Sequence, residues 1–309
     1  MTIRGCLIWV CKARCVYFDR YGVYLGGGMV NREGVLPTAP LYFVLSGVRF
    51  KLRESLPAWI GPIQESLHEA GYPHLSRVRQ SAGNGGMELA IDPEDFDPAH
   101  PGAAFLFSSN DRTRSIQIHK SGLTVFSKSY VRFDQFVTGL SSAVEAILSS
   151  SKYLEIETIG IRYLDFIRPR DGEQLSAYVS GGLLPFQPSW EGWVGRVLTG
   201  AHMSSYKIGD DRLTVRFLGE GNPVVPPDLA MAFLSSLNLA EGLTPDPIPM
   251  IGNEQGTLDI DAFRDGFLLH AGEVKQVEDE LRRLHDVANK FFRKVCSDHA
   301  FSRWNEESQ

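Results

Sequence analysis

The chain has 309 residues, of which 43% are hydrophobic and 22% charged, and its formal net charge is −6. This composition is typical of a globular protein with a well-developed core, and the acidic balance disfavours nucleic-acid binding, which usually needs a basic face. No apolar run approaches the roughly 18 residues of a membrane span, and the N-terminal residues lack a signal cleavage site, so we expect a cytoplasmic protein without a membrane partner.

Residues 1–28 differ in composition from the rest of the chain. They carry Cys6, Cys11 and Cys15, whose spacing lacks a CxxC pair and a nearby histidine, so a zinc site is only weakly indicated. Three glycines precede Met29, and glycine codons begin with GG, as in a bacterial ribosome-binding site. We therefore expect residues 1–28 to be a translated leader or extension outside the domain. A flexible linker is one alternative, and a phosphate-binding loop, which lacks the Lys-Ser/Thr of a Walker motif, is another.

Residues 29–152 predict a first α+β half. The β-branched and aromatic run at 39–52 predicts a strand, and apolar residues at helical spacing follow at 56–72. Four or five short strands separated by turns come next, and 116–126 form a predicted hairpin. Residues 132–150 then predict a long amphipathic helix.

Residues 153–309 repeat this order in part. A strand is predicted at 153–169 and a closing amphipathic helix, with Cys296 buried at its end, at 274–296. Between them we expect a short helix at 173–181 and strands at 193–208, 212–219, 248–252 and 256–263. The apolar run at 227–242 predicts either a helix capped by Asp228 or a buried strand.

The two halves share a local pattern in their first strands. Gly-Val-Arg-Phe at 47–50 corresponds to Gly-Ile-Arg-Tyr at 160–163. Together with the similar order of elements, this predicts a duplicated α+β fold of strand-helix-(four or five strands)-helix units. The units would form a curved antiparallel sheet with the long helices on one face and a helix-free surface on the other. At this level the arrangement is similar to the TATA-binding saddle and to duplicated helix-grip domains.

Several blocks of sequence resemble a sporadically distributed bacterial protein family of unknown function, over about residues 35–304: LPTAPLYFVLSGVRF, SIQIHKSGLTVFSKSY, TIGIRYLDFI and LDIDAFRDG. The resemblance implies no reaction, cofactor or catalytic residue. It implies asparagine where this chain has Asp165, which argues against an invariant catalytic use of that position. It also implies a patchy distribution like that of genes on mobile elements, including phage-defence and toxin–antitoxin islands.

Two arginines are candidate ligand-binding residues. Arg49 and Arg162 occupy equivalent strand positions in the duplicated fold, so together they can clamp a carboxylate or a phosphate. The alternative is that each pairs with an acid on a neighbouring strand, such as Asp165 or Glu157.

A histidine and two tryptophans complete the predicted ligand-binding set. His119, in the hairpin, is either an anion contact or general base, or a strand residue on the solvent face. Trp190 and Trp193 lie in a Pro- and Gly-punctuated loop, which predicts the lip of a pocket or a partner contact, although core packing is the commoner role for such residues.

A metal site is the alternative chemistry. Asp259 and Asp261 lie two apart on a predicted strand, hence on one face, and Glu254 is nearby. Such carboxylates can bind Mg²⁺, but a polar edge face explains them as well, since further ligands are not identified.

The sequence contains no GxSxG, HExxH or Walker motif and no GxGxxG between a strand and a helix. We therefore expect a non-enzymatic recognition or effector protein without a cofactor, which binds a partner protein or a small anionic or amphipathic ligand. Phage defence or a toxin–antitoxin-like system is its expected setting. A metal-dependent hydrolase or nuclease using Asp259 and Asp261 is the alternative, and the sequence predicts no oligomeric state.

Overall fold

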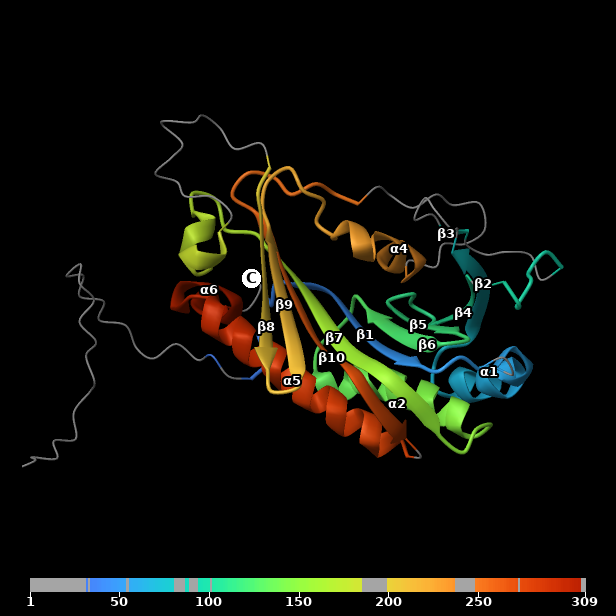
Figure 1. Ribbon diagram of the computed structural model, residues 1–309. Helices are drawn as coiled ribbons and strands as arrows, with labels where there is room; N and C mark the ends of the chain where they lie inside the picture. Colours follow the sequence, from blue (N-terminus) through green and yellow to red (C-terminus); the bar gives the residue numbers. More distant parts are fainter. Residues whose placement is uncertain are drawn as a thin grey trace, which may run out of the picture. The chain divides into compact units, whose positions relative to one another are not determined.

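The strands form one antiparallel sheet in the order β3-β2-β4-β5-β6-β1-β7-β10-β9-β8 (Figure 1). The computed structural model describes residues 32, 34–53, 56–80, 87–88, 94–100, 102–184, 199–236, 248–271 and 273–306. The predicted α+β class is confirmed. The expected leader and its cysteines lie outside the described residues.

The elements before residue 150 follow the predicted order. They are β1 (Leu41–Phe50), η1 (Leu56–Trp59), α1 (Ile60–Glu69), β2 (His74–Gln80), β3 (Met87–Glu88), β4 (Ala103–Ser108), β5 (Arg114–His119), β6 (Gly122–Ser127) and α2 (Phe133–Leu148). The helical spacing in the sequence is explained by burial, because Ile63 and Leu67 of α1 are fully buried. Strands β5 and β6 form the predicted hairpin, in which His119 pairs with Gly122.

The later elements depart from the predictions in places. They are β7 (Leu154–Ile167), η2 (Leu175–Ala177), η3 (Gly181–Leu183), β8 (Ala201–Ile208), β9 (Asp211–Leu218), α4 (Pro227–Ser236), β10 (Gly256–Ala271), α5 (Val274–Val295) and α6 (Asp298–Asn305). Within the expected short helix at 173–181 only the 3₁₀ turn η2 forms, with η3 beginning at its last residue, and 248–252 makes one isolated bridge, Met250 to Pro223, in place of a strand. Helix α6 was not expected, although Ser297 caps it by accepting a hydrogen bond from the amide of Ala300.

Side chains on the sheet alternate between two faces. On the α5 face, Tyr163 of β7 and His285 of α5 share a hydrogen bond of 2.7 Å. Helix α2 lies on this face too, since its Gly139 abuts Val125 of β6. None of the described helices is long and apolar enough to cross a bilayer.

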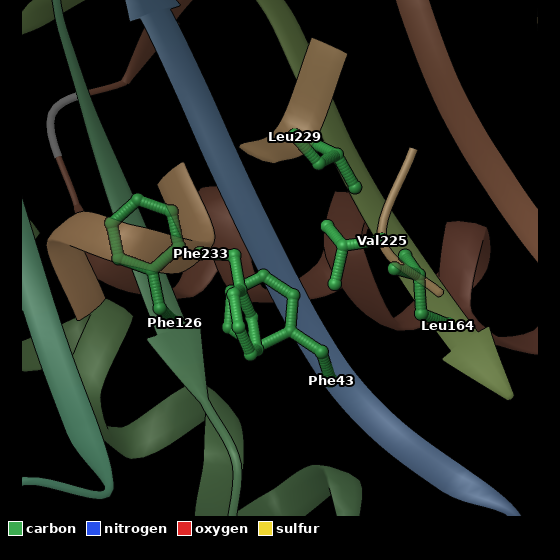
Figure 2. Packing of buried hydrophobic residues seen from close by; sticks show 6 residues of the cluster. All are labelled: Phe43, Phe126, Leu164, Val225, Leu229 and Phe233. Carbon is green, nitrogen blue, oxygen red and sulfur yellow. The ribbon is translucent and has the colours of Figure 1, made fainter. Parts of the chain in front are cut away.

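Helix α4 covers part of the opposite face, called here the α4 face (Figure 1). Leu229 and Phe233 of α4 pack against Phe43, Phe126 and Leu164 from the three central strands (Figure 2). The expectation that this surface is free of helices is therefore wrong where α4 packs on the central strands. Of the two structures predicted for the apolar run at 227–242, the helix forms. Pro227 is tolerated in its first turn, and Leu229 and Phe233, four residues apart, lie on one side of the helix and reach the same core.

Candidate ligand-binding site

Two glycines pair at the centre of the sheet. Gly47 of β1 lies directly opposite Gly160 of β7, and both belong to the α4 face. Because neither residue has a side chain, the sheet is hollowed here into a cavity of about 380 Å³. We call it the glycine hollow; the side chains that matter most in its lining are those of Arg49, His119, Thr124, Thr158, Arg162 and Asp261.

The two glycines differ in how much space surrounds them. A Cβ atom at Gly160 would lie 3.0 Å from Cβ of Phe263 and 3.3 Å from the carbonyl oxygen of Ala262, which is tighter than ordinary packing. At Gly47 the nearest atoms, on Leu123 and Thr124, are 3.7 Å from such a Cβ. A side chain is therefore tolerated at Gly47 and would project into the hollow.

Arg162 is part of a buried ion-pair network. It donates from Nε and Nη2 to the two carboxylate oxygens of Asp259, at 2.7 Å each, and from Nη1 to Asp228 of α4 at 2.8 Å. The side chains of Arg162 and Asp259 are only 7% and 2% exposed. This bidentate geometry fixes the guanidinium in place. Arg162 lines the hollow, but its donors are used within the protein, as the alternative interpretation expected.

The partners of Arg162 differ from those expected. Asp165 lies on the α5 face, one residue beyond the α4-face position of Leu164, so it does not meet Arg162. Arg216 of β9 completes the network instead, with Nη1 at 3.0 Å from both oxygens of Asp228 and 3.4 Å from Asp259. Burial raises the pKa of Asp228, but hydrogen bonds from Arg162 and Arg216 outweigh burial and hold that pKa below its ordinary value.

Arg49 is more accessible. Its side chain is 63% exposed, and the nearest carboxylate, that of Glu157, is 3.8 Å away and itself 42% exposed. Exposed pairs of this kind contribute little free energy, so a ligand anion can replace Glu157 at small cost. Of the two arginines predicted to clamp an anion, Arg49 is the one whose donors a ligand can reach.

His119 and Asp261 add polar groups to the hollow. Burial lowers the pKa of His119, which favours the neutral imidazole, and its Nδ1 lies 3.3 Å from Oγ of Ser121. Burial raises the pKa of Asp261 to about 6, against the opposing charge of Arg162. At neutral pH the hollow thus offers a neutral imidazole, one largely ionised carboxyl group and one accessible cation.

The geometry does not favour the alternative metal site. Asp259 and Asp261 do share the α4 face, because they pair with Leu164 and Arg162 respectively. However, both oxygens of Asp259 accept hydrogen bonds from Arg162, and Glu254 accepts one from the amide of Leu175 at 2.9 Å. Among the described residues no three His, Cys, Asp or Glu side chains are grouped to hold a metal ion.

Two of the predicted ligand-binding residues, Trp190 and Trp193, lie outside the described residues. Sequence reasoning missed the roles of Asp228 and Arg216, and it did not use the shared glycines as evidence for a cavity.

Comparisons of the chain with protein-family models, curated proteins and solved structures find no match. The family resemblance remains a prediction, and function is inferred from the glycine hollow itself.

Proposed function

We propose that the protein is a non-enzymatic recognition protein that binds a small amphipathic anion in the glycine hollow. The observation that carries this proposal is an accessible arginine beside a mostly apolar depression. Arg49 would receive the carboxylate or phosphate of the ligand, while the apolar part would lie over Gly47 and Gly160 and against Phe263. Such a protein needs no cofactor and would act in the cytoplasm.

We further propose that the fold is an internal duplication of residues 29–152 and 153–309. In support, β1 pairs with β6 and β7 pairs with β10, so the first strand of each half pairs with the strand before its long helix. The long helices α2 and α5 pack on the same face of the sheet. The direct pairing of Gly47 with Gly160 fits a pseudo-twofold axis between the halves. The ligand would then bind where the two halves meet.

A segment of a partner protein is the alternative occupant of the hollow, because an extended chain also presents apolar groups and carboxylates. A role in phage defence or in a toxin–antitoxin-like system rests on the family resemblance. The proposed anion site is independent of that setting, and it can be tested with a probe anion on the purified protein.

Arg49→Gln is expected to weaken binding of the amphipathic anion 8-anilinonaphthalene-1-sulfonate about tenfold, since a charge-assisted hydrogen bond contributes about 1.5 kcal/mol or more. Fluorescence titration measures the affinity. Arg212→Gln is the matched control: Arg212 lies on the same face, is 60% exposed and pairs with Asp265 at 3.6 Å. Equal affinities of both variants and the wild type would argue against a role for Arg49.

Gly47→Val is expected to abolish binding of the same probe while leaving the melting temperature within a few degrees of wild type. Valine suits a strand, and a Cβ at Gly47 meets nothing closer than 3.7 Å. Ser205→Val is the control, because Ser205 is exposed on the α4 face of β8 and lies outside the hollow. A folded Gly47→Val protein that binds the probe as the wild type does would exclude the hollow as the site.

A further inference from the structure

A second and larger cavity lies on the α5 face, on the other side of the sheet from the glycine hollow. Its volume is about 730 Å³, and it is bounded by residues 34–39, the start of α2, the end of β7 and α5. We call it the aromatic cavity; the lining residues used here are Tyr130, Phe133, Tyr163, Asp165, His285 and Phe292. The volume is in the range of sites for small organic ligands.

Asp165 is the exceptional group in this cavity. The residue is only 5% exposed, yet its carboxyl group lines the cavity and, within the described part of the chain, receives no hydrogen bond or ion pair. A buried carboxylate without a partner is costly to ionise. Burial, with the charge of Asp259 on the adjacent strand, raises the pKa of Asp165 to about 8. A cation bound beside Asp165 would supply the partner that its ionised carboxylate lacks.

Two of the arginines that line the cavity with Asp165 are engaged elsewhere. Arg282 donates to Asp134 at 2.8 Å and lies over the ring of Phe133. Arg293 donates to Asn289 at 2.9 Å and to the carbonyl oxygen of Gly34 at 3.1 Å. Within the described residues, the other titratable or charged groups that face the cavity or adjoin it are Arg32, Tyr130, Arg132, Tyr163, His285, Asp286 and Cys296. Among the described residues, none of the arginines forms an ion pair with Asp165.

The walls determine which kind of cation fits. Phe133 and His285 stack with ring centroids 4.4 Å apart, and Tyr130 lies edge-on to Tyr163 at 5.8 Å. Aromatic faces attract organic cations through cation–π interactions. A metal ion would need several oxygen ligands close together, and among the described residues no three His, Cys, Asp or Glu side chains are grouped to hold one, although Asp134 and Asp286 also line the cavity.

We propose that the aromatic cavity binds a small organic ammonium ion. The Asp165 carboxylate neutralises its positive charge, and the aromatic rings of Phe133 and Phe292 contact its apolar part. This site does not depend on the anion site proposed for the glycine hollow, because the two cavities open on opposite faces of the sheet and share no lining residue.

The first test is calorimetric titration of the full-length protein at about pH 9, where Asp165 is mostly ionised, with benzyltrimethylammonium, and with benzyl alcohol and phenylacetate as neutral and anionic analogues. Saturable binding of the cation is expected, at least about tenfold tighter than either analogue, since attraction between opposite charges is several times stronger in a site shielded from water than in bulk solvent. Asp165→Asn keeps the shape of the side chain and should lose that advantage. Absence of saturable binding, or equal affinity of wild type and Asp165→Asn, would overturn the proposal.

The second test uses pH. The charge of benzyltrimethylammonium does not titrate, so its affinity should follow ionisation of Asp165 and rise about tenfold between about pH 7 and pH 9. Titration of His285 and Tyr130 should not contribute to this rise between about pH 7 and pH 9. Burial lowers the pKa of His285 from 6.5, and burial raises the pKa of Tyr130 to about 12. The rise should vanish in Asp165→Asn and persist in Gly47→Val, which fills the other cavity. A flat profile in the wild type would contradict the assignment.

Discussion

Asp259→Ala is expected to lower the free energy of unfolding by about 3–5 kcal/mol, the usual cost of removing one partner from a buried ion pair. Asp259 is 1% exposed and takes two hydrogen bonds of 2.7 Å from Arg162. Without it, Arg162 keeps only Asp228, whose side chain is 49% exposed. The guanidinium would then be buried with incomplete charge compensation. Urea unfolding followed by circular dichroism measures the change.

Asp265→Ala is the matched control on the same strand. Asp265 also pairs with an arginine, Arg212, at 3.6 Å, but the two side chains are 38% and 60% exposed. Solvent screens such a pair, so its removal should cost less than about 1 kcal/mol. Similar losses in the two variants would mean that burial of the Arg162 network does not stabilise the fold as described.

The second large effect is a pH-dependent gain in stability from Asp165→Asn. The pKa of Asp165 is raised from 3.8 to about 8, so the carboxyl group stays protonated in the folded protein while it ionises in the unfolded chain. Its contribution to stability is therefore greatest below about pH 4 and is lost progressively as the pH rises towards 8. At about 1.4 kcal/mol per pKa unit, the loss is on the order of 5 kcal/mol above pH 8.

Urea unfolding of the wild type and of Asp165→Asn, at about pH 4, 6 and 8, tests this linkage. The difference between the two proteins should shift in favour of Asp165→Asn as the pH rises. A constant offset, from the different hydrogen bonding of the buried amide, leaves that trend intact. The pKa of Asp261 is also raised, to about 6. Because Asp261 is present in both proteins, its effect on stability cancels in the difference between them. Parallel stability curves would show that Asp165 ionises freely in the folded protein.

The periodic elements of this fold were predictable from sequence. Strong amphipathic patterns identify α2 and α5, because one stripe of each helix is buried in the core: Phe136, Leu140, Val144 and Ile147 in α2, and Val277, Leu281, Leu284 and Ala288 in α5. The run that became α4 was ambiguous, since nearly every residue in it is apolar or small. Its docking on the sheet depends on Phe43, Phe126 and Leu164, which are distant in the sequence.

The site was predictable in part. The shared Gly-x-Arg pattern identified Arg49 and Arg162, and both line one hollow. The partners of Arg162 were not predictable, because Asp228 and Asp259 lie 66 and 97 residues away along the chain. The sequence did indicate on which face of the sheet Asp165 lies. On a regular strand, an odd spacing from Arg162 places the two side chains on opposite faces, which excludes the expected pair.

Helix α4 contributes to an asymmetric distribution of charge along the glycine hollow. By supplying Asp228 it completes the network in which Asp228 and Asp259 balance Arg162 and Arg216, whereas Arg49, two residues beyond the other central glycine, pairs among the described residues only with the exposed Glu157, at 3.8 Å. The cavity therefore has a positive end at Arg49 and a negative end at Asp261, which is largely ionised at neutral pH, although the strands that build it pair symmetrically around two glycines. An elongated anion entering it is expected to dock head first towards β1, in one of the two orientations that the backbone alone would allow.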